Sequence, residues 1–513
     1  MCKYLRRPAP GGQAPHVNID TQSALPLTVL TRNDEVRVHH LYHTRRQSMG
    51  RFLRKIFAVA TTLTIVLAFG PLAPAAVAAQ TKEDKAVLDE LLDILKDKGH
   101  ITEDKYQELK TRAKKEGAER LLAGLKDWTP YLKSADGQHK VELHGRLNFD
   151  VRSYEGDAKK LDSNRSNVSP TRSDLVTNLL VRRARIGIDA TFFKYLDFKV
   201  EGDFSEGSSF SLTDGYGELN YWPEFRVRGG QFKVPFSFEE LTSSRFIDFV
   251  ERSVVNNLVP ARDVGAMVHG SLLGGSLDYS AGIFNGTGAN ASDKNDSKDY
   301  AGRLLVRPFK GLDVPLLQKL HIAGHMTYGD QDKADSLRGR TDARFEFFPR
   351  VPTQGDRVRY GFEVVHAYGP FGLYGEYVKT REERNGLGTG GTDLDDVEGR
   401  GWYVASTWLL TGEEKVHGKA PKVKNNFDPR TGRWGALELA ARFAQLDFIS
   451  DDPLASPGEN GVDALTVGFN WYLSPNVRLM FNYVNNWYDN KKMTAVKGDE
   501  TSWEILSRLA VWF

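Results

Sequence analysis

Arginines recur at every second position in two segments of the chain. Arg183 and Arg185 form one such pair, and Arg226 and Arg228 form another. A guanidinium group carries a permanent positive charge and a planar fork of N–H donors that matches the oxygens of phosphate. Closely spaced sites of moderate strength let an ion enter a pore and also leave it. Paired arginines at this spacing are therefore candidates for transient contacts with an anion.

The sequence contains none of the motifs of the common enzyme classes. It has no H-E-x-x-H, Walker loop or G-x-S-x-G motif, and the glycine-rich run 386–391 lies in a polar segment without a strand–helix context. The 12 histidines show no metal-ligand spacing, and we expect His144 and His321 on a wall or rim. Basic residues form no cluster of the kind that nucleic acids need. We expect no catalytic residue, metal, cofactor or nucleic-acid partner.

From Val141 onward, apolar and polar residues alternate with a period of two, which predicts strands with one apolar and one polar face. A soluble β-sandwich shows the same alternation. Segments of about ten residues or more, aromatic residues near their ends and unequal connections favour a membrane-spanning barrel. The mean hydropathy of −0.44 agrees, since only alternate residues of such strands are apolar.

Residues 141–513 contain seventeen candidate strands, whereas barrels of this kind have an even number. The weakest candidate is 340–347, and we assign it to one long outer loop. The expected fold is all-β: a transmembrane antiparallel β-barrel of about 16 strands in the bacterial outer membrane, with outer-membrane lipid around it.

Strand parity predicts which arginines line the lumen. An arginine facing lipid at mid-depth costs about 2–4 kcal/mol, so the four arginines named above should point inward. Lys233 has the opposite parity to Arg228, and we expect a β-bulge at Gly229–Gly230 to correct it. Arg182 also has the wrong parity, which predicts a position near a rim.

The start of the chain resembles an export signal. Residues 49–79 combine a basic head, an apolar run and a small-residue exit, which is typical of a signal peptide. Translation would then begin at Met49, and 1–48 would be a mis-assigned extension; a transmembrane anchor is the alternative. Residues 80–513 hold 59 Lys and Arg against 64 Asp and Glu, and the single cysteine, Cys2, is lost. Selection of anions would therefore depend on local placement of charge rather than on net charge.

Residues 80–130 differ from the rest, because leucines recur there at spacings of three and four. This pattern predicts a periplasmic α-helical segment, with Gly99 ending one helix and Thr102 capping the next. A coiled coil formed with neighbouring copies and a flexible spacer both fit the pattern.

Several ordered motifs resemble the phosphate-selective porin O/P family. They are Gly230–Phe236 (GQFKVPF), Phe238–Phe246 (FEELTSSRF), Glu251–Ser253 and Val264–Gly265, with Arg182–Gly187 (RRARIG) in support. The similarity covers about 141–513. It implies a sixteen-stranded outer-membrane barrel, usually a homotrimer, that conducts inorganic phosphate or other anions, with residues 236–260 folding inward. The terminal Phe513 would be recognised by the barrel assembly machinery.

The resemblance also assigns the central anion-binding role to Lys233 and Arg245. An acidic partner is expected in the constriction, with Asp203 as the candidate and Glu206 as the second choice. Arg252, beside Glu251, is a further candidate, although it could simply pin the loop. The alternative functions are a general anion-preferring or non-specific porin, a barrel enzyme and a plugged structural or adhesive barrel.

Overall fold

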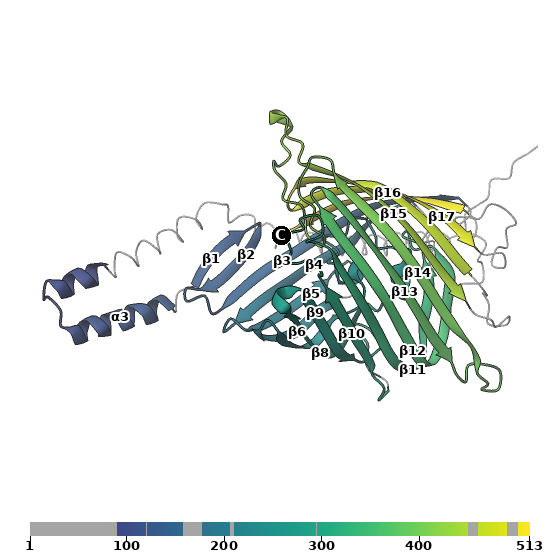
Figure 1. Ribbon diagram of the computed structural model, residues 1–513, viewed down its shortest axis with the longest axis horizontal. Helices are drawn as coiled ribbons and strands as arrows, with labels where there is room; N and C mark the ends of the chain where they lie inside the picture. The colour runs from purple at the N-terminus through teal and green to yellow at the C-terminus, as the bar shows by residue number, and fades with distance from the viewer. Residues whose placement is uncertain are drawn as a thin grey trace, which may run out of the picture. The chain divides into compact units, whose positions relative to one another are not determined.

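The computed structural model describes residues 90–118, 121–156, 177–205, 210–293, 295–449, 460–489 and 501–513. Within these ranges, strands β3 to β18 pair in chain order, each antiparallel to the next. Strand β18 pairs back onto β3, from Ser502 opposite Gly156 to Trp512 opposite Arg146. This pairing closes a barrel of sixteen strands, as the sequence predicted (Figure 1).

Most barrel strands are long enough to cross an apolar layer at a tilt. They are β3 (Lys140–Gly156), β4 (Asn178–Phe192), β5 (Leu196–Asp203), β6 (Ser211–Trp222), β7 (Phe225–Lys233), β8 (Arg262–Leu272), β9 (Leu277–Phe284), β10 (Asp299–Val306), β11 (His321–Arg340), β12 (Glu346–Tyr368), β13 (Phe371–Arg384), β14 (Leu394–Leu409), β15 (Ala436–Ile449), β16 (Asn460–Ser474), β17 (Val477–Asp489) and β18 (Thr501–Trp512).

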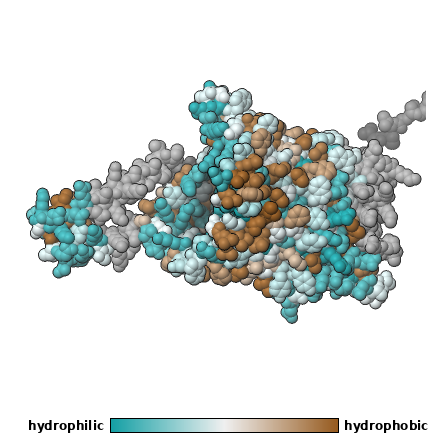
Figure 2. Space-filling view, in the orientation of Figure 1, coloured by the Kyte–Doolittle hydropathy of each residue, from teal (hydrophilic) through white to brown (hydrophobic). Residues whose placement is uncertain are grey.

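The two faces of the strands differ in polarity, as the alternation requires. On β3, Leu147 and Phe149 are exposed on the outside, whereas Arg146, Asp150 and Arg152 are buried on the inside. Figure 2 shows hydrophobic residues gathered over the outer surface of the barrel strands. Such a belt suits contact with lipid, and it leaves the charged side chains to the lumen.

Connections are short at one end of the barrel and mostly long at the other. At the short-turn end, Phe193 and Lys194 both take positive φ, the conformation of a tight hairpin turn. The same end carries the short 3₁₀ turn η2 (Leu273–Gly275) and two longer links, 307–320 and the link that contains η3 (Pro429–Thr431).

The segment 340–347 does not form the long outer loop that we predicted. Strand β11 runs to Arg340 and β12 starts at Glu346, so only five residues turn the chain between them. The tip lies inside the barrel, where Asp342 pairs with Arg442 at 2.8 Å and Phe348 is fully buried. Because the tip is buried among other side chains, it lacks the alternation of a wall strand.

The N-terminal described region contains a helix over 90–97 and α3 (Glu103–Ala118). The Thr102 hydroxyl accepts a hydrogen bond from the Lys105 amide at 3.3 Å, and the Tyr106 hydroxyl donates to Asp93 at 2.5 Å. None of the helices in the described residues is long and apolar enough to cross a membrane. The predicted signal peptide and start at Met49 lie outside the described residues.

The predicted helical segment ends earlier than residue 130. Residues Leu121–Lys126 (β1) and Thr129–Ser134 (β2) form a hairpin instead, and β2 adds to the edge of β3. Gly124 weakens a helix at this position, and the Tyr131 ring occupies the space that a side chain at Gly124 would need. The leucines of β1 therefore belong to a strand.

Candidate functional site

Residues 234–261 leave β7, cross the interior of the barrel and return to β8; we call them the inward loop. It contains α5 (Phe238–Leu241) and η1 (Val254–Leu258). The Ser237 hydroxyl donates to Glu376 of β13 at 3.0 Å, and the Val250 amide donates to Asn482 of β17 at 2.7 Å. Because β13 and β17 lie well around the barrel from β7 and β8, the inward loop must span the lumen.

The predicted bulge at Gly229–Gly230 is wrong. Strand β7 pairs with both β6 and β8 without a register shift at these glycines. Gly230 instead takes a φ of 131°, and a Cβ there would overlap the carbonyl of Gly215. Pairing of β7 with β6 stops at Gln231, which frees the last residues of β7 to bring Lys233 to the inward loop.

Lys233 and Arg252 both hold the end of α5. The Lys233 ammonium contacts the carbonyl oxygens of Glu240, Leu241 and Thr242, the last at 3.1 Å. Arg252 donates to the carbonyls of Glu239 at 2.8 Å and of Glu240 and Thr242 at 3.2 Å each. These are the unsatisfied carbonyls of a helix C-terminus, where cations are stabilising. Both cations therefore shape the inward loop.

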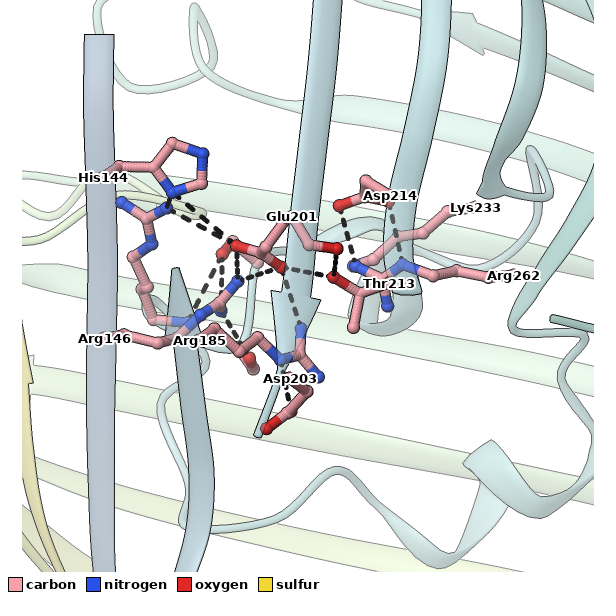
Figure 3. A network of polar contacts seen from close by, with 12 residues as sticks. His144, Arg146, Arg185, Glu201, Asp203, Thr213, Asp214, Lys233 and Arg262 are labelled. Carbon is pink, nitrogen blue, oxygen red and sulfur yellow. Dashed lines mark hydrogen bonds and ion pairs between the residues drawn. The ribbon is translucent and has the colours of Figure 1, made fainter. Parts of the chain in front are cut away.

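Three arginines surround the carboxylate of Glu201 on β5 (Figure 3). Nη2 of Arg146 donates to both carboxylate oxygens of Glu201, at 2.6 and 2.8 Å, and Nη1 of Arg185 donates to the same carboxylate at 3.2 Å. Arg245 of the inward loop is 3.9 Å from Glu201 and 2.9 Å from Nδ1 of His144. The Glu201 carboxylate thus contacts three cations, one of which, Arg185, also pairs with Asp203.

Asp203 lies beside this cluster, but its carboxylate is already occupied. It accepts hydrogen bonds from Arg185 at 2.6 Å, from the Ala184 amide at 3.1 Å and from the Ser205 hydroxyl at 2.7 Å. It fixes Arg185 against the wall. Glu206, the second acidic candidate, lies outside the described residues.

A second cluster surrounds Glu251 of the inward loop. The carboxylate lies 2.5 Å from Arg152, 2.8 Å from Arg182 and 3.0 Å from Arg508. Burial raises the pKa of the Glu251 carboxyl, but the guanidinium groups of Arg182 and its neighbours outweigh burial and hold that pKa well below its usual range. Glu251 therefore stays ionised and ties the inward loop to the wall.

A bulge in the backbone explains the parity of Arg182 without a rim position. The register of β3 and β4 shifts between Asn148 and Phe149, so that Arg182 is an extra residue on β4. This bulge turns the side chain inward, toward Glu251. A local backbone irregularity thus corrects the parity of Arg182, as bulges commonly do where a side chain must be re-aimed.

Arg183 is the least satisfied member of the Glu251 cluster. Its side chain is 4 % exposed, its Nη2 is 3.7 Å from Glu251, and its Nη1 has no hydrogen-bond partner among the described residues. The cluster balances Arg152, Arg182, Arg183 and Arg508 against Glu251 and Asp150. Among the described residues in these ion pairs, four positive charges face two negative ones, so this part of the site has the charge and a free donor to hold an anion.

Arg226 and Arg228 lie elsewhere, toward the short-turn end of β7. Arg228 pairs with Glu218 at 2.5 Å and stacks over Tyr216, 4.2 Å from the ring centre. The predicted site residues are therefore divided between the inward loop and a separate part of the wall.

Our sequence-based site list omitted three arginines that the structure places in the two clusters. They are Arg146, Arg152 and Arg508. All three alternate with apolar residues on terminal strands of the barrel, so strand parity alone could have identified them.

Comparisons with known proteins agree with this architecture. A family model described as phosphate-selective porin O and P matches residues 147–506. Porin O of Pseudomonas aeruginosa is 23% identical over 415 residues, covering 74% of this chain and 90% of that protein. A protein of Aquifex aeolicus is 25% identical over 447 residues, covering 79% and 91% respectively.

Solved porin structures give weaker similarities. An anion-selective porin from Comamonas acidovorans is 13% identical, covers 73% of this chain and 100% of its own, and has a TM-score of 0.44. A loop-deletion mutant of OmpT from Vibrio cholerae is 11% identical with the same coverage and a TM-score of 0.47. At these scores the superpositions add nothing to the strand pairing. The family match spans most of the barrel, and the chain therefore belongs to the phosphate-selective porin O and P family, as a porin channel of the bacterial outer membrane.

Proposed function

We propose that this channel carries anions inward by passive diffusion and that it holds inorganic phosphate or a related oxyanion at the Glu251 cluster. Arg183 would make the main contact with the anion. The other proposed contacts along the path are Arg185, Arg245, Arg226 and Arg228. Lys233 and Arg252, which hold the end of α5, and Asp203, which fixes Arg185, would act by positioning these contacts.

The observation that carries this proposal is the charge surplus around Arg183. A buried guanidinium with an unused N–H group carries a penalty of about 1–3 kcal/mol, which an oxyanion would relieve. Phosphate offers several oxygens to the guanidinium forks, whereas chloride offers a single point charge. The description of the matching family, which names phosphate, supports the same ligand class.

The alternative is a general anion-preferring pore in which the arginines only repel cations. Planar-bilayer recording of the purified channel distinguishes the two. Chloride current is recorded while phosphate is added, and we expect phosphate to block it at low concentration. Arg183→Gln should raise the half-blocking phosphate concentration about tenfold, the equivalent of losing one charged hydrogen bond.

The matched control is Arg430→Gln, because Arg430 is an exposed arginine in the long link at the short-turn end. This variant should leave the block unchanged. A wild-type chloride current that phosphate does not affect would overturn specific binding and leave the general pore. An Arg183→Gln variant that is blocked like the wild type would instead move the site elsewhere, with Lys233 and Arg245 tested next.

We further propose that the protein assembles as a homotrimer after export by the signal peptide, with the N-terminal helices contributing a coiled coil. Leu91, Ile94 and Leu95 of the helix at 90–97 remain exposed, although Leu92 is buried. An exposed apolar stripe on a charged helix is favourable only when it is covered. Neighbouring copies of the same helix would cover it.

A further inference from the structure

Three side chains from neighbouring strands meet on the inner wall of the barrel, away from the arginine clusters. They are His325 of β11, Glu363 of β12 and Glu376 of β13, and one ligand atom of each lies within 4.8 Å of the other two. Nε2 of His325 is 3.3 Å from Oε1 of Glu376 and 3.8 Å from Oε2 of Glu363. All three side chains are at most 1 % exposed.

The three atoms that face one another have no hydrogen bonds among the described residues, and Nδ1 of His325 has none either. Among the described residues, His325 Nε2, Glu363 Oε2 and Glu376 Oε1 all lack a hydrogen-bond partner. Leaving three such atoms buried and unpaired would cost about 1–3 kcal/mol each. Something that bonds to all three at once would remove that cost.

The remaining atoms of the two carboxylates are already held in place. Oε1 of Glu363 accepts a hydrogen bond from Arg303. Oε2 of Glu376 accepts from the Ser237 hydroxyl at 3.0 Å and from the Tyr403 hydroxyl at 3.1 Å. Supporting contacts of this kind orient the ligands of protein metal sites.

We propose that His325, Glu363 and Glu376 bind a divalent transition-metal ion of the Zn²⁺ type. One imidazole nitrogen and two carboxylate oxygens form a three-ligand set of the kind that Zn²⁺ accepts, with water as the fourth ligand. Bonds of about 2.0–2.2 Å place tetrahedral ligand atoms roughly 3.3–3.5 Å apart. The His325–Glu376 distance already fits, and the His325–Glu363 distance of 3.8 Å is a few tenths of an ångström too long. The two carboxylate oxygens lie within 4.8 Å of each other and would close on the ion as it binds.

Charge balance and position also favour a cation. The two carboxylates offset both charges of a divalent ion, and Arg303 pairs with the outer oxygen of Glu363 beside them. The ion would join three consecutive wall strands, and through Ser237 it would also brace the base of the inward loop. Phe236 covers the imidazole with ring centres 4.0 Å apart, which keeps bulk water from the site.

The test uses the full-length channel purified in detergent, stripped with a chelator and then incubated with zinc. After free zinc is removed, elemental analysis should find about one zinc per chain, and His325→Ala and Glu376→Gln should each reduce it at least tenfold. His269→Ala is the matched control, because His269 is another lumenal histidine and pairs with Glu218 at 3.1 Å. It should keep the metal. The heat-dependent gel shift of folded barrels verifies that each variant has folded.

A second readout needs no variant. Cobalt loaded into the wild-type channel should give the intense visible absorption of a tetrahedral ion. Failure of the wild type to retain zinc above the level of His325→Ala, or an absent cobalt band, would overturn the proposal. A shared proton between His325 and Glu376 would then account for the contact.

Discussion

Most lumenal arginines are neutralised by carboxylates, and a residue with an unpaired charge or N–H group is the one available to a ligand. Arg442 and Arg508 are almost fully buried, and each is neutralised by carboxylates, Arg442 by Glu239 and Asp342 and Arg508 by Asp150 and Glu251. A buried charge without a partner is strongly destabilising, so most lumenal arginines have a fixed structural task. Arg183 differs, because its Nη1 has no hydrogen-bond partner in the part of the chain that the structure describes.

The backbone at Gly230 gives a prediction at the residue scale. Gly230→Ala should destabilise the barrel by about 1–3 kcal/mol or more, since alanine rarely adopts a positive φ and its Cβ would meet the Gly215 carbonyl. Gly229→Ala is the internal control, because a Cβ there meets nothing within 4 Å. The heat-dependent gel shift, followed against temperature, measures both. Equal melting of the two variants would contradict the role of Gly230.

The low pKa of Glu251 gives a second prediction at the residue scale. Its folded-state pKa lies below the unfolded value of about 4.3, so its contribution to stability is complete above that pH and is lost only as the pH falls through the folded-state pKa. We therefore expect no change in channel conductance between pH 7 and 5 that depends on Glu251. A conductance step in that window that Glu251→Gln abolishes would be evidence against this picture.

Strand parity predicted the inward orientation of Arg183 and Arg185 but failed for Arg182 and Lys233. Both failures come from the backbone: an extra residue on β4 in one case and the end of β6–β7 pairing at Gln231 in the other. Neither changes the order of polar and apolar residues in a way that alternation can detect. Ion-pair partners such as Arg508 and Asp150 are also far apart in sequence, so only the closed fold brings them together.

Two elements enter the barrel, and together they decide how much of the lumen is open. The inward loop contributes Phe249 and Val250 to an apolar cluster, and the tip of the β11–β12 hairpin contributes Phe345 and Phe348. The Phe348 ring stacks on Phe448 of the wall at 4.1 Å. The hairpin tip is therefore a fixed obstruction and not a loose outer loop.

Shortening this hairpin should widen the passage. Replacing residues 339–348 by a two-residue Asn-Gly turn removes the phenyl groups from the lumen, and we expect single-channel conductance to rise at least twofold. Replacing the exposed glycine-rich run 386–391 in the same way should change conductance little, because that run lies outside the apolar cluster. A hairpin variant with wild-type conductance would show that current passes elsewhere.

The sequence predicted the wall elements well and the inserted ones poorly. Alternation over 141–513 gave seventeen candidate strands, and the even strand number of such barrels reduced them to the sixteen that the structure contains. Alternation works here because every wall strand faces lipid on one side and the lumen on the other. Residues 340–347 and the β1–β2 hairpin lack that environment, so their patterns predicted a loop and a helix instead. The alternation of polar and apolar residues identifies a strand only where its two faces meet different surroundings along its length.

For the whole molecule, the exposed leucines of the N-terminal region give a prediction about assembly. Leu91→Glu combined with Leu95→Glu should weaken chemical cross-linking between copies at least severalfold, since charge on the stripe opposes its burial. Lys98→Glu, on the same exposed region, should have little effect. Barrel folding should be normal in both variants. Unchanged cross-linking in the leucine variant would contradict a coiled coil between copies.

The inward loop hangs from β7 and β8, yet it is bonded to distant walls: Val250 accepts a hydrogen bond from Arg508 of β18, and Ser237 donates to Glu376 of β13. It therefore acts as a strut across a tube. The cross-section of the barrel cannot change from round to oval unless the inward loop moves with the walls. The shape of the barrel and the width of its constriction are therefore mechanically coupled. Lateral pressure in the surrounding bilayer would then be transmitted directly to the flow of solute.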